Sequence, residues 1–182
     1  MQVSLVKALN WCLKRDSAAR MAASNILSMH PFDEAIDLSP TAPHQFTGAT
    51  HPAYANMIGP FGGTTSAQLL QSALLHPERL GEPVALTVNF AAPVADGEIR
   101  FVARPVRTNR STQHWIIEAH QTQNDTEGVV ATATAVFAVR RETWSDVEAV
   151  MPVNVPSPDA VPRMPVKGMP AWPQRYDMRF VE

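Results

Sequence analysis

The sequence predicts an α+β fold in which one central helix is wrapped by a curved antiparallel sheet. Three observations predict it: an uncharged helix over residues 64–75, a double glycine directly before this helix, and four strand-like runs after it. A helix at a protein surface combines an apolar stripe with an opposite charged face. Because this helix offers only small, aliphatic and neutral polar side chains, we expect the rest of the domain to cover it.

Both ends of the predicted helix carry recognisable signals. Thr65 and Gln68 have the spacing of a capping box, which would satisfy the first free backbone N–H groups. His76 and Pro77 follow the helix, and a proline removes the next backbone donor. We therefore expect the helix to start on the double glycine and to end before His76.

Four strands with short turns are expected after the helix. They cover residues 84–92, 99–107, 112–122 and 129–139. In the first run the even-numbered residues from Val84 to Phe90 are all apolar and share one face, so one face should belong to the core. Turn residues such as Asp96-Gly97 separate the runs, and short turns join antiparallel neighbours. The last run is expected to form the longest strand.

Composition argues against several classes of function. The formal net charge is −2 and no basic stripe runs through the body of the chain, which argues against nucleic-acid binding. The single cysteine, Cys12, can form neither an internal disulfide nor a paired zinc site. We therefore expect a soluble, cytoplasmic protein that binds neither nucleic acid nor a membrane.

The two ends of the chain differ from its central part. Residues 1–28 combine a basic amphipathic stripe with an Ala- and Ser-rich stretch, so a peripheral helix, an over-extended start and an organellar transit peptide all stay open. Prolines recur between residues 151 and 173, which is typical of a linker. We expect an extension over 1–28, a folded domain over 29–141, a linker over 142–174, and the first strand of a truncated second domain over 175–182.

Three motifs together resemble a known family. They are Gly59-Pro60-Phe61-Gly62-Gly63, the segment 88–93 with Asp96-Gly97, and the segment 131–137. In this order and spacing they resemble the N-terminal repeat of the double-hotdog acyl-CoA thioesterases, the thioesterase II-like group. The resemblance spans about residues 32–140, and the segment 176–179 resembles the opening of a second repeat. It implies a hotdog fold, hydrolysis of acyl-CoA to free acid and CoA, and no cofactor apart from the CoA of the substrate.

Thioester hydrolysis needs donors that polarise the carbonyl oxygen and a group that orients or deprotonates water. The backbone N–H groups of Gly62, Gly63 and Thr64 lie at the predicted helix N-terminus, where free donors and the helix dipole favour an oxyanion. Tight packing between strand and helix is the alternative reason for two glycines at this position.

The second requirement has no obvious candidate, because the polar amide side chains of the helix are limited to Gln68 and Gln71. The resemblance implies that the catalytic Asp, Thr or Ser, and Gln belong to a C-terminal repeat, so none is assigned to a residue here. Asn56 and Gln68 remain as candidates for shared chemistry. Candidate substrate contacts are Phe61, Met57, Asn89 and Gln71.

Three further groups are also candidates for a function. His51 is a possible base with Tyr54 as its partner, although a turn role is the simpler explanation. A rim of arginines, Arg100, Arg104, Arg107 and Arg110, has the chemistry to hold CoA phosphates. His114, Glu118 and His120 share one strand face, which fits either metal ligands or a solvated sheet face, and we assign no metal site.

Two classes of function therefore stay open: an acyl-CoA thioesterase, or its N-terminal portion, and a non-catalytic hotdog module that binds acyl-CoA or dimerises. A hydratase of the same fold is less well supported, because the helix lacks an Asp-His or Glu-His pair. A hotdog sheet has a long free edge, so we expect pairing with a second repeat or with a second copy of the chain.

Overall fold

The computed structural model describes residues 29–181. The expected N-terminal extension, residues 1–28, lies outside the described residues. The chain divides into two units, Met1–Asp33 and Glu34–Glu182. A short helix, α2 (Pro31–Ala35), spans the boundary between the two units. The architecture and the sites below belong to the second unit.

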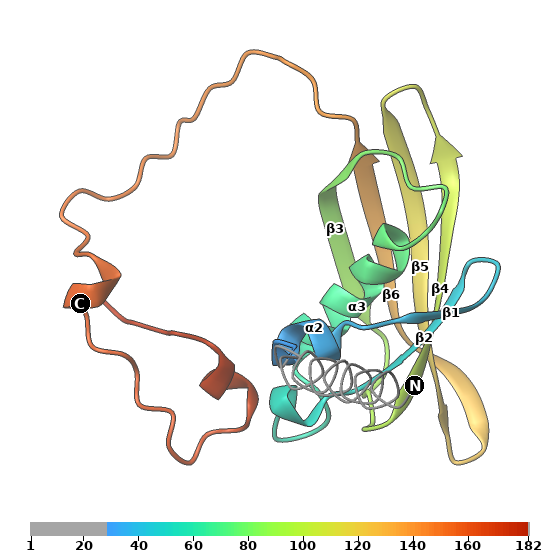
Figure 1. The fold of residues 1–182 in the computed structure, drawn as a ribbon, viewed down its shortest axis with the longest axis horizontal. Helices are drawn as coiled ribbons and strands as arrows, with labels where there is room; N and C mark the ends of the chain where they lie inside the picture. Colours follow the sequence, from blue (N-terminus) through green and yellow to red (C-terminus); the bar gives the residue numbers. More distant parts are fainter. Residues whose placement is uncertain (1–28, 182) are drawn as a thin grey trace, which may run out of the picture. The chain divides into compact units, whose positions relative to one another are not determined.

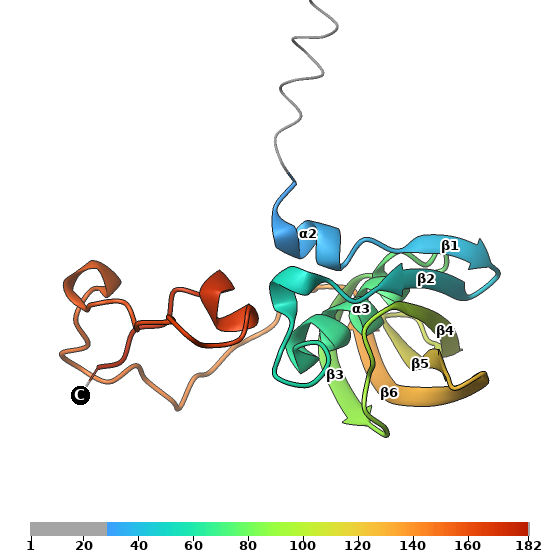
Figure 2. The same cartoon turned by 90° about the horizontal axis from the view of Figure 1, so that it is seen from below.

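The second unit contains a six-stranded antiparallel sheet and one long helix, α3 (Gly62–Leu74). The strands are β1 (Ser39–Ala42), β2 (Gln45–Ala49), β3 (Glu82–Phe90), β4 (Glu98–Thr108), β5 (Thr112–Gln123) and β6 (Thr126–Ala138). Their order in the sheet is β1-β2-β4-β5-β6-β3, and the sheet curves around α3 (Figures 1 and 2). The predicted α+β class, the central helix and the four following strands are confirmed.

Two strands before the helix were not predicted. β1 and β2 form a hairpin around His44, whose backbone has a φ of +63°. The hairpin extends the sheet, because β2 pairs with β4 from Gln45↔Val102 to Ala49↔Glu98. Every residue of β1 is exposed, so its sequence carries no alternation of apolar and polar residues.

The core lies between α3 and the inner face of the sheet. Alternate residues of the central strands are fully buried there, among them Ile99, Phe101, Trp115, Ile117 and Phe137. α3 contributes Leu69 and Ala73 to the same cluster. Burial of this kind contributes about 25 cal/mol per Å² of apolar surface, and it is the main force that holds the helix on the sheet.

The expected core face of β3 is only partly correct. Leu86 and Val88 pack against the core, whereas Val84 and Phe90 are 57% and 53% exposed. The pairing register of β3 with β6 shifts between Pro83 and Ala85, which breaks the alternation at the start of the strand. β3 is also the last strand of the sheet, so its ends have a neighbour on one side alone.

The predicted cover of the helix agrees with the structure, but the predicted capping box is wrong. Every residue of α3 except Gly63 is buried or half-buried, which explains the absence of charge. The helix begins at Gly62 with Phe61 as N-cap and without a side-chain capping bond. Gln68 instead donates from Nε2 to Ala35 O and Ala49 O, both at 2.8 Å, because a buried amide needs partners and the carbonyls at the ends of α2 and β2 lie beside it.

Residues 139–181 contain two 3-10 turns, η2 (Pro158–Ala160) and η3 (Trp172–Arg175), and no strand. The strand expected from residue 175 onward is therefore wrong for the described residues. Polar contacts with the preceding segment take its place: Met164 N–H donates to Met178 O at 2.8 Å. The linker and second-repeat boundaries stay a prediction.

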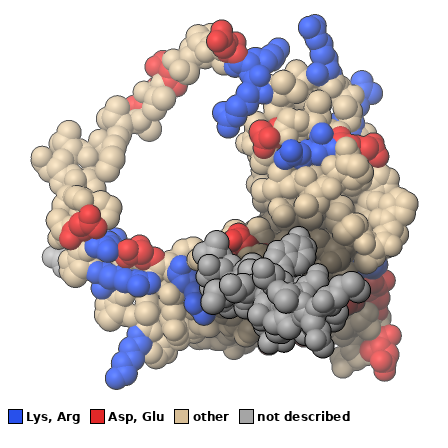
Figure 3. Space-filling model, in the orientation of Figure 1, with Lys and Arg blue, Asp and Glu red and all other residues tan. Residues whose placement is uncertain are grey.

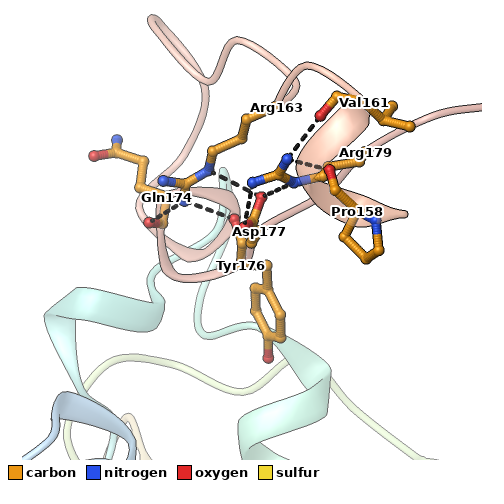
Figure 4. A network of polar contacts seen from close by, with 7 residues as sticks. All are labelled: Pro158, Val161, Arg163, Gln174, Tyr176, Asp177 and Arg179. Carbon is orange, nitrogen blue, oxygen red and sulfur yellow. Dashed lines mark hydrogen bonds and ion pairs between the residues drawn. The ribbon is translucent and has the colours of Figure 1, made fainter. Parts of the chain in front are cut away.

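Asp177 lies at the centre of these contacts (Figure 4). Arg179 donates to both of its carboxylate oxygens at 2.9 and 3.0 Å, and also to Val161 O and Pro158 O. Arg163 donates to Tyr176 O at 2.8 Å. The hydrogen bond from Arg179 is the main cause that keeps the pKa of Asp177 below its ordinary value.

Candidate functional site

The N-terminus of α3 leaves two backbone donors open. Phe61 O accepts the Thr64 N–H at 3.0 Å, the Thr65 N–H at 3.4 Å and the Thr64 hydroxyl at 2.6 Å. The Thr64 amide is therefore already engaged in the first turn of the helix. Within the described part of the chain, the N–H groups of Gly62 and Gly63 have no acceptor. Two of the three expected oxyanion donors are therefore unpaired among the described residues, and their role as oxyanion donors stays a prediction.

Both glycines also lie close to aromatic rings. A Cβ on Gly63 would lie 2.3 Å from the Phe61 ring, and a Cβ on Gly62 would lie 3.1 Å from the Phe90 ring. Close approach of an aromatic ring is thus observed at both glycines, whereas the donor explanation stays a prediction. Gly63 is the one residue of α3 that is exposed, whereas the others are buried or half-buried.

A tight loop precedes the helix and fixes its direction. Gly59 has a φ of +64°, and Asn56 N–H donates to Gly59 O at 2.8 Å. Phe61 N–H then donates to Tyr54 O at 2.8 Å. The loop tip carries Met57, which is 85% exposed.

An apolar hollow of about 230 Å³ lies beside the open amides. Its walls are Ile58, Pro60, Gly62 and Thr65 on the helix side and Phe90, Ala92, Pro93 and Val94 on the strand side. The walls contain no histidine, carboxylate or basic group. A small apolar group can therefore bind next to the Gly62 N–H, but no wall residue can act as a base toward it.

An aromatic cluster covers the start of the helix. Trp172 stacks on Phe61 with ring centroids 4.3 Å apart and planes 7° from parallel, and Tyr176 meets both rings edge-on. Trp172 Nε1 donates to Asn56 Oδ1 at 3.3 Å, and its backbone N–H donates to Ala55 O. No local sequence pattern indicates this contact, because 116 residues separate Asn56 from Trp172.

Some of the predicted site residues lie near the start of α3, and others lie elsewhere or have structural roles. Phe61 lies directly before Gly62 and Gly63, and the Asn56 amide oxygen is engaged by Trp172. Gln68 is 3% exposed, and its side-chain donors serve two backbone carbonyls, so it supports the fold and does not face a ligand. Gln71 is half-buried on the next turn of the helix and Asn89 is exposed on β3, away from the hollow.

His51 is fixed at both ring nitrogens. Nδ1 accepts the Ala53 N–H at 3.2 Å, so the ring proton is on Nε2, which lies 3.2 Å from Glu34 Oε2. Its ring also meets the Tyr54 ring at a centroid distance of 6.4 Å. These contacts make His51 the cap of a 3-10 turn, η1 (Pro52–Tyr54). It has no unshared nitrogen lone pair for a base.

The arginine rim and the β5 histidines are surface groups. Arg100 pairs with Glu127 at 2.7 Å, and Arg107 donates to Asn109 Oδ1. His120 Nε2 lies 3.2 Å from Glu118 Oε2, while His114 takes no part in that pair. Figure 3 shows basic and acidic side chains interspersed on one face of the molecule. Of the described residues, the group with metal-ligand spacing is His44, His76 and Glu78, which the sequence did not indicate.

Comparison with known proteins identifies the family of this chain. Residues 51–138 match the acyl-CoA thioesterase N-terminal domain. A conserved protein of unknown function with a hotdog fold from Alicyclobacillus acidocaldarius is 50% identical, with a TM-score of 0.78, over 85% of this chain and 56% of that one. The chain belongs to the thioesterase II-like hotdog family. The predicted family and fold are confirmed.

More distant structures agree in fold. A candidate thioesterase II from Thermobifida fusca is 17% identical, with a TM-score of 0.66, over 81% of this chain and 52% of that one. An acyl-CoA thioesterase II from Mycobacterium marinum is 22% identical, with a TM-score of 0.58, over 72% and 47%. The chain thus spans about half the length of these structures. No curated protein is significantly similar to it in sequence.

Among residues 29–181, no helix is both long enough and apolar enough to cross a bilayer.

Proposed function

We propose that this domain takes part in the hydrolysis of acyl-CoA thioesters to free acid and CoA. The observation that carries the proposal is the pair of open N–H groups, Gly62 and Gly63, beside an apolar hollow that Gly62 itself lines. The family relation supports the same reaction class. In this arrangement the thioester oxygen accepts hydrogen bonds from the two amides, and the start of the acyl chain occupies the hollow.

The two amides would stabilise the negative charge that develops on the carbonyl oxygen. Water attacks the carbonyl carbon, the carbon–sulfur bond breaks, and CoA leaves as its thiol after taking up a proton. Preorganised backbone donors are suited to this task because they need no reorientation during the reaction. The reaction needs no cofactor beyond the CoA of the substrate.

The group that activates water must come from outside the hollow described here. Because no ionisable side chain lines it, we assign the water-orienting residues to a second hotdog repeat or subunit. The free edge of β3 supports such pairing: the strand has a partner on one side, and Val84 and Phe90 are exposed on it. The exposed Arg104 and Arg110 would be available to CoA phosphates. A cytoplasmic location remains part of the proposal.

A panel of acyl-CoAs with free-thiol detection tests the proposal. The panel is applied to this chain alone and to this chain paired with a second hotdog repeat. We expect thiol release by the paired form and little by the single domain. Release by the single domain at the same rate would contradict the assignment of the water-orienting group.

The absence of an ionisable wall residue also favours a second function, an acyl-CoA binding module without catalysis. The same panel separates the two when it is combined with a non-hydrolysable thioether analogue of the substrate. Binding of the analogue without thiol release by either form would favour the binding module.

A further inference from the structure

A second hollow lies at the opposite end of α3. It has a volume of about 440 Å³, and its apolar walls include Leu38, Pro40, Phe46 and Leu75, with His44 and His76 as polar members. α3 has 13 residues and is therefore about 20 Å long, so this hollow is well separated from the Gly62 amide. The proposed thioester chemistry makes no use of it.

His44 and His76 form a hydrogen-bonded pair, called the relay below. A backbone N–H group determines which ring is the donor in this pair. Glu78 N–H donates to His76 Nδ1 at 3.1 Å, and an amide N–H can act as a donor only. A neutral His76 ring must then carry its proton on Nε2, which lies 2.7 Å from His44 Nδ1. His76 is therefore the donor and His44 the acceptor in this bond. A neutral His44 in turn carries its proton on Nε2.

The surroundings favour the neutral form of this relay. His76 is 4% exposed and packs edge-on against Trp115, with ring centroids 5.0 Å apart. Burial lowers the pKa of His76, the neighbouring His44 lowers it further, and Glu78 partly opposes both effects. A second proton on His76 would occupy Nδ1 and face the Glu78 N–H, so that two donors would meet.

The unpaired Nε2–H group of His44 determines which kind of ligand atom can bind beside it. Among the described residues, His44 Nε2 has no acceptor, and the walls around it are largely apolar. Neither lysine nor arginine lines the hollow, and its charged member is Glu78. An anionic ligand would therefore meet repulsion without a compensating cation, whereas a neutral oxygen can accept the His44 proton.

We propose that this hollow binds a neutral apolar molecule with one acceptor oxygen, such as an aromatic or aliphatic ketone. Its carbonyl oxygen accepts the hydrogen bond from His44 Nε2, and its hydrocarbon part fills the space between the β1–β2 hairpin and the end of α3.

Metal binding is the competing explanation for the same residues. His44, His76 and Glu78 offer ligand atoms that all lie within 4.8 Å of one another. A histidine ligand needs an unprotonated nitrogen with a free lone pair. His76 has none in this arrangement, since Nδ1 accepts from Glu78 and Nε2 donates to His44. Binding of a metal through His76 would therefore require one of these two hydrogen bonds to break.

The relay itself is tested by long-range ¹H–¹⁵N correlation spectra of the histidine rings at pH 7.5. We expect both His44 and His76 to carry their proton on Nε2. A proton on Nδ1 of His76 would overturn the proposal. So would a stoichiometric response of both rings to added zinc chloride.

Ligand binding is tested with three probes of similar shape: acetophenone, α-methylstyrene, which replaces the carbonyl oxygen by a methylene group, and benzoate. Affinities are measured by NMR titration. We expect acetophenone to move the His44 Nε2–H signal downfield. α-Methylstyrene should leave this signal at its position in the ligand-free protein. Benzoate should bind more weakly than both. Absence of saturation by acetophenone at millimolar concentration, or tighter binding of benzoate, would overturn the proposal.

The hydrogen bond is isolated by a variant. His44→Asn tolerates the positive φ of this position but has a shorter side chain. It should lower the affinity ratio of acetophenone to α-methylstyrene about five-fold, the value of one neutral hydrogen bond. His114→Asn, on an exposed β5 position, is the matched control and should keep the ratio. An unchanged ratio in His44→Asn contradicts the proposal, and if this variant does not fold, the acetophenone shift in the unaltered protein decides.

Discussion

The two ends of helix α3 obtain their hydrogen-bonding groups from different sources. At the start, Gly62 and Gly63 offer backbone N–H groups that donate no hydrogen bond to any described residue. At the end, His44 and His76 offer side chains from positions 32 residues apart. A donor that belongs to the backbone is present wherever a helix begins, whereas a side-chain relay exists only after the fold has formed. The first kind of site can therefore be predicted from local sequence, and the second cannot.

The largest expected effect comes from removing one amide at the start of the helix. Gly62→Pro deletes the N–H, and proline is tolerated at the first helical position. Phe61 has a ψ of 125°, which suits a residue before proline. In the paired, active form we expect a loss of about 100-fold in kcat, the usual effect of one oxyanion donor. Thiol release from acyl-CoA measures it.

Gly62→Ala is the control for that experiment. It adds a Cβ at the same place, 3.1 Å from the Phe90 ring, but keeps the N–H. Its activity should stay well above that of Gly62→Pro. Equal losses in both variants would assign the effect to packing and remove the amide from the mechanism.

The same contrast explains which parts of the fold were predictable. The four long strands follow from local alternation, and the lack of charge in α3 indicates its cover. β1 was missed because its short run, with Pro40 in it, is wholly exposed and shows no alternation. Its pairing depends on the turn at His44, whose φ of +63° is uncommon for any residue other than glycine.

Long-range partners explain the errors at the candidate sites. Gln68 has capping-box spacing, yet the carbonyls that satisfy it belong to Ala35 and Ala49, 33 and 19 residues earlier. His76 was interpreted as the end of the helix, and its burial against Trp115 is a tertiary contact. Likewise, nothing near Phe61 in the sequence indicates that Trp172 stacks on it.

The next largest effect concerns the loop that directs the helix start. Gly59→Ala combines a φ of +64° with a Cβ 2.2 Å from Val94 O, a backbone atom that cannot easily move. We expect the free energy of unfolding in urea to fall by about 2 kcal/mol, as for other strained backbone positions. Gly128→Ala, where a Cβ meets nothing within 4 Å, should change it little. Equal effects would contradict the strain argument.

A smaller effect is expected from the aromatic cover of the helix start. Trp172→Ala removes the stack on Phe61 and the hydrogen bond to Asn56. An aromatic pair contributes about 1 kcal/mol beyond its buried area. We expect faster amide exchange at residues 55 and 61 and faster proteolysis after residue 160. Trp144→Ala, whose side chain is 83% exposed, is the control and should leave both rates unchanged.

The smallest effect concerns pH and the other end of the helix. The folded state lowers the pKa of His76, chiefly through burial, below its ordinary value of 6.5. As the pH falls below that value the unfolded state binds more protons than the folded state, so the free energy of unfolding decreases toward acid. Above about pH 6.5 this loss is absent. His76→Phe keeps the ring contacts with Trp115 and Phe46 but cannot titrate.

Urea unfolding at pH 7.5 and pH 5.5 measures this difference. The variant is expected to be less stable than the unaltered protein at pH 7.5, because Glu78 N–H and His44 Nδ1 lose their partner. The informative quantity is the change between the two pH values, which should be smaller in His76→Phe. An equal change in the free energy of unfolding in both proteins would mean that folding does not lower the pKa of His76. The argument that His76 is held neutral, with its proton on Nε2, would then fail.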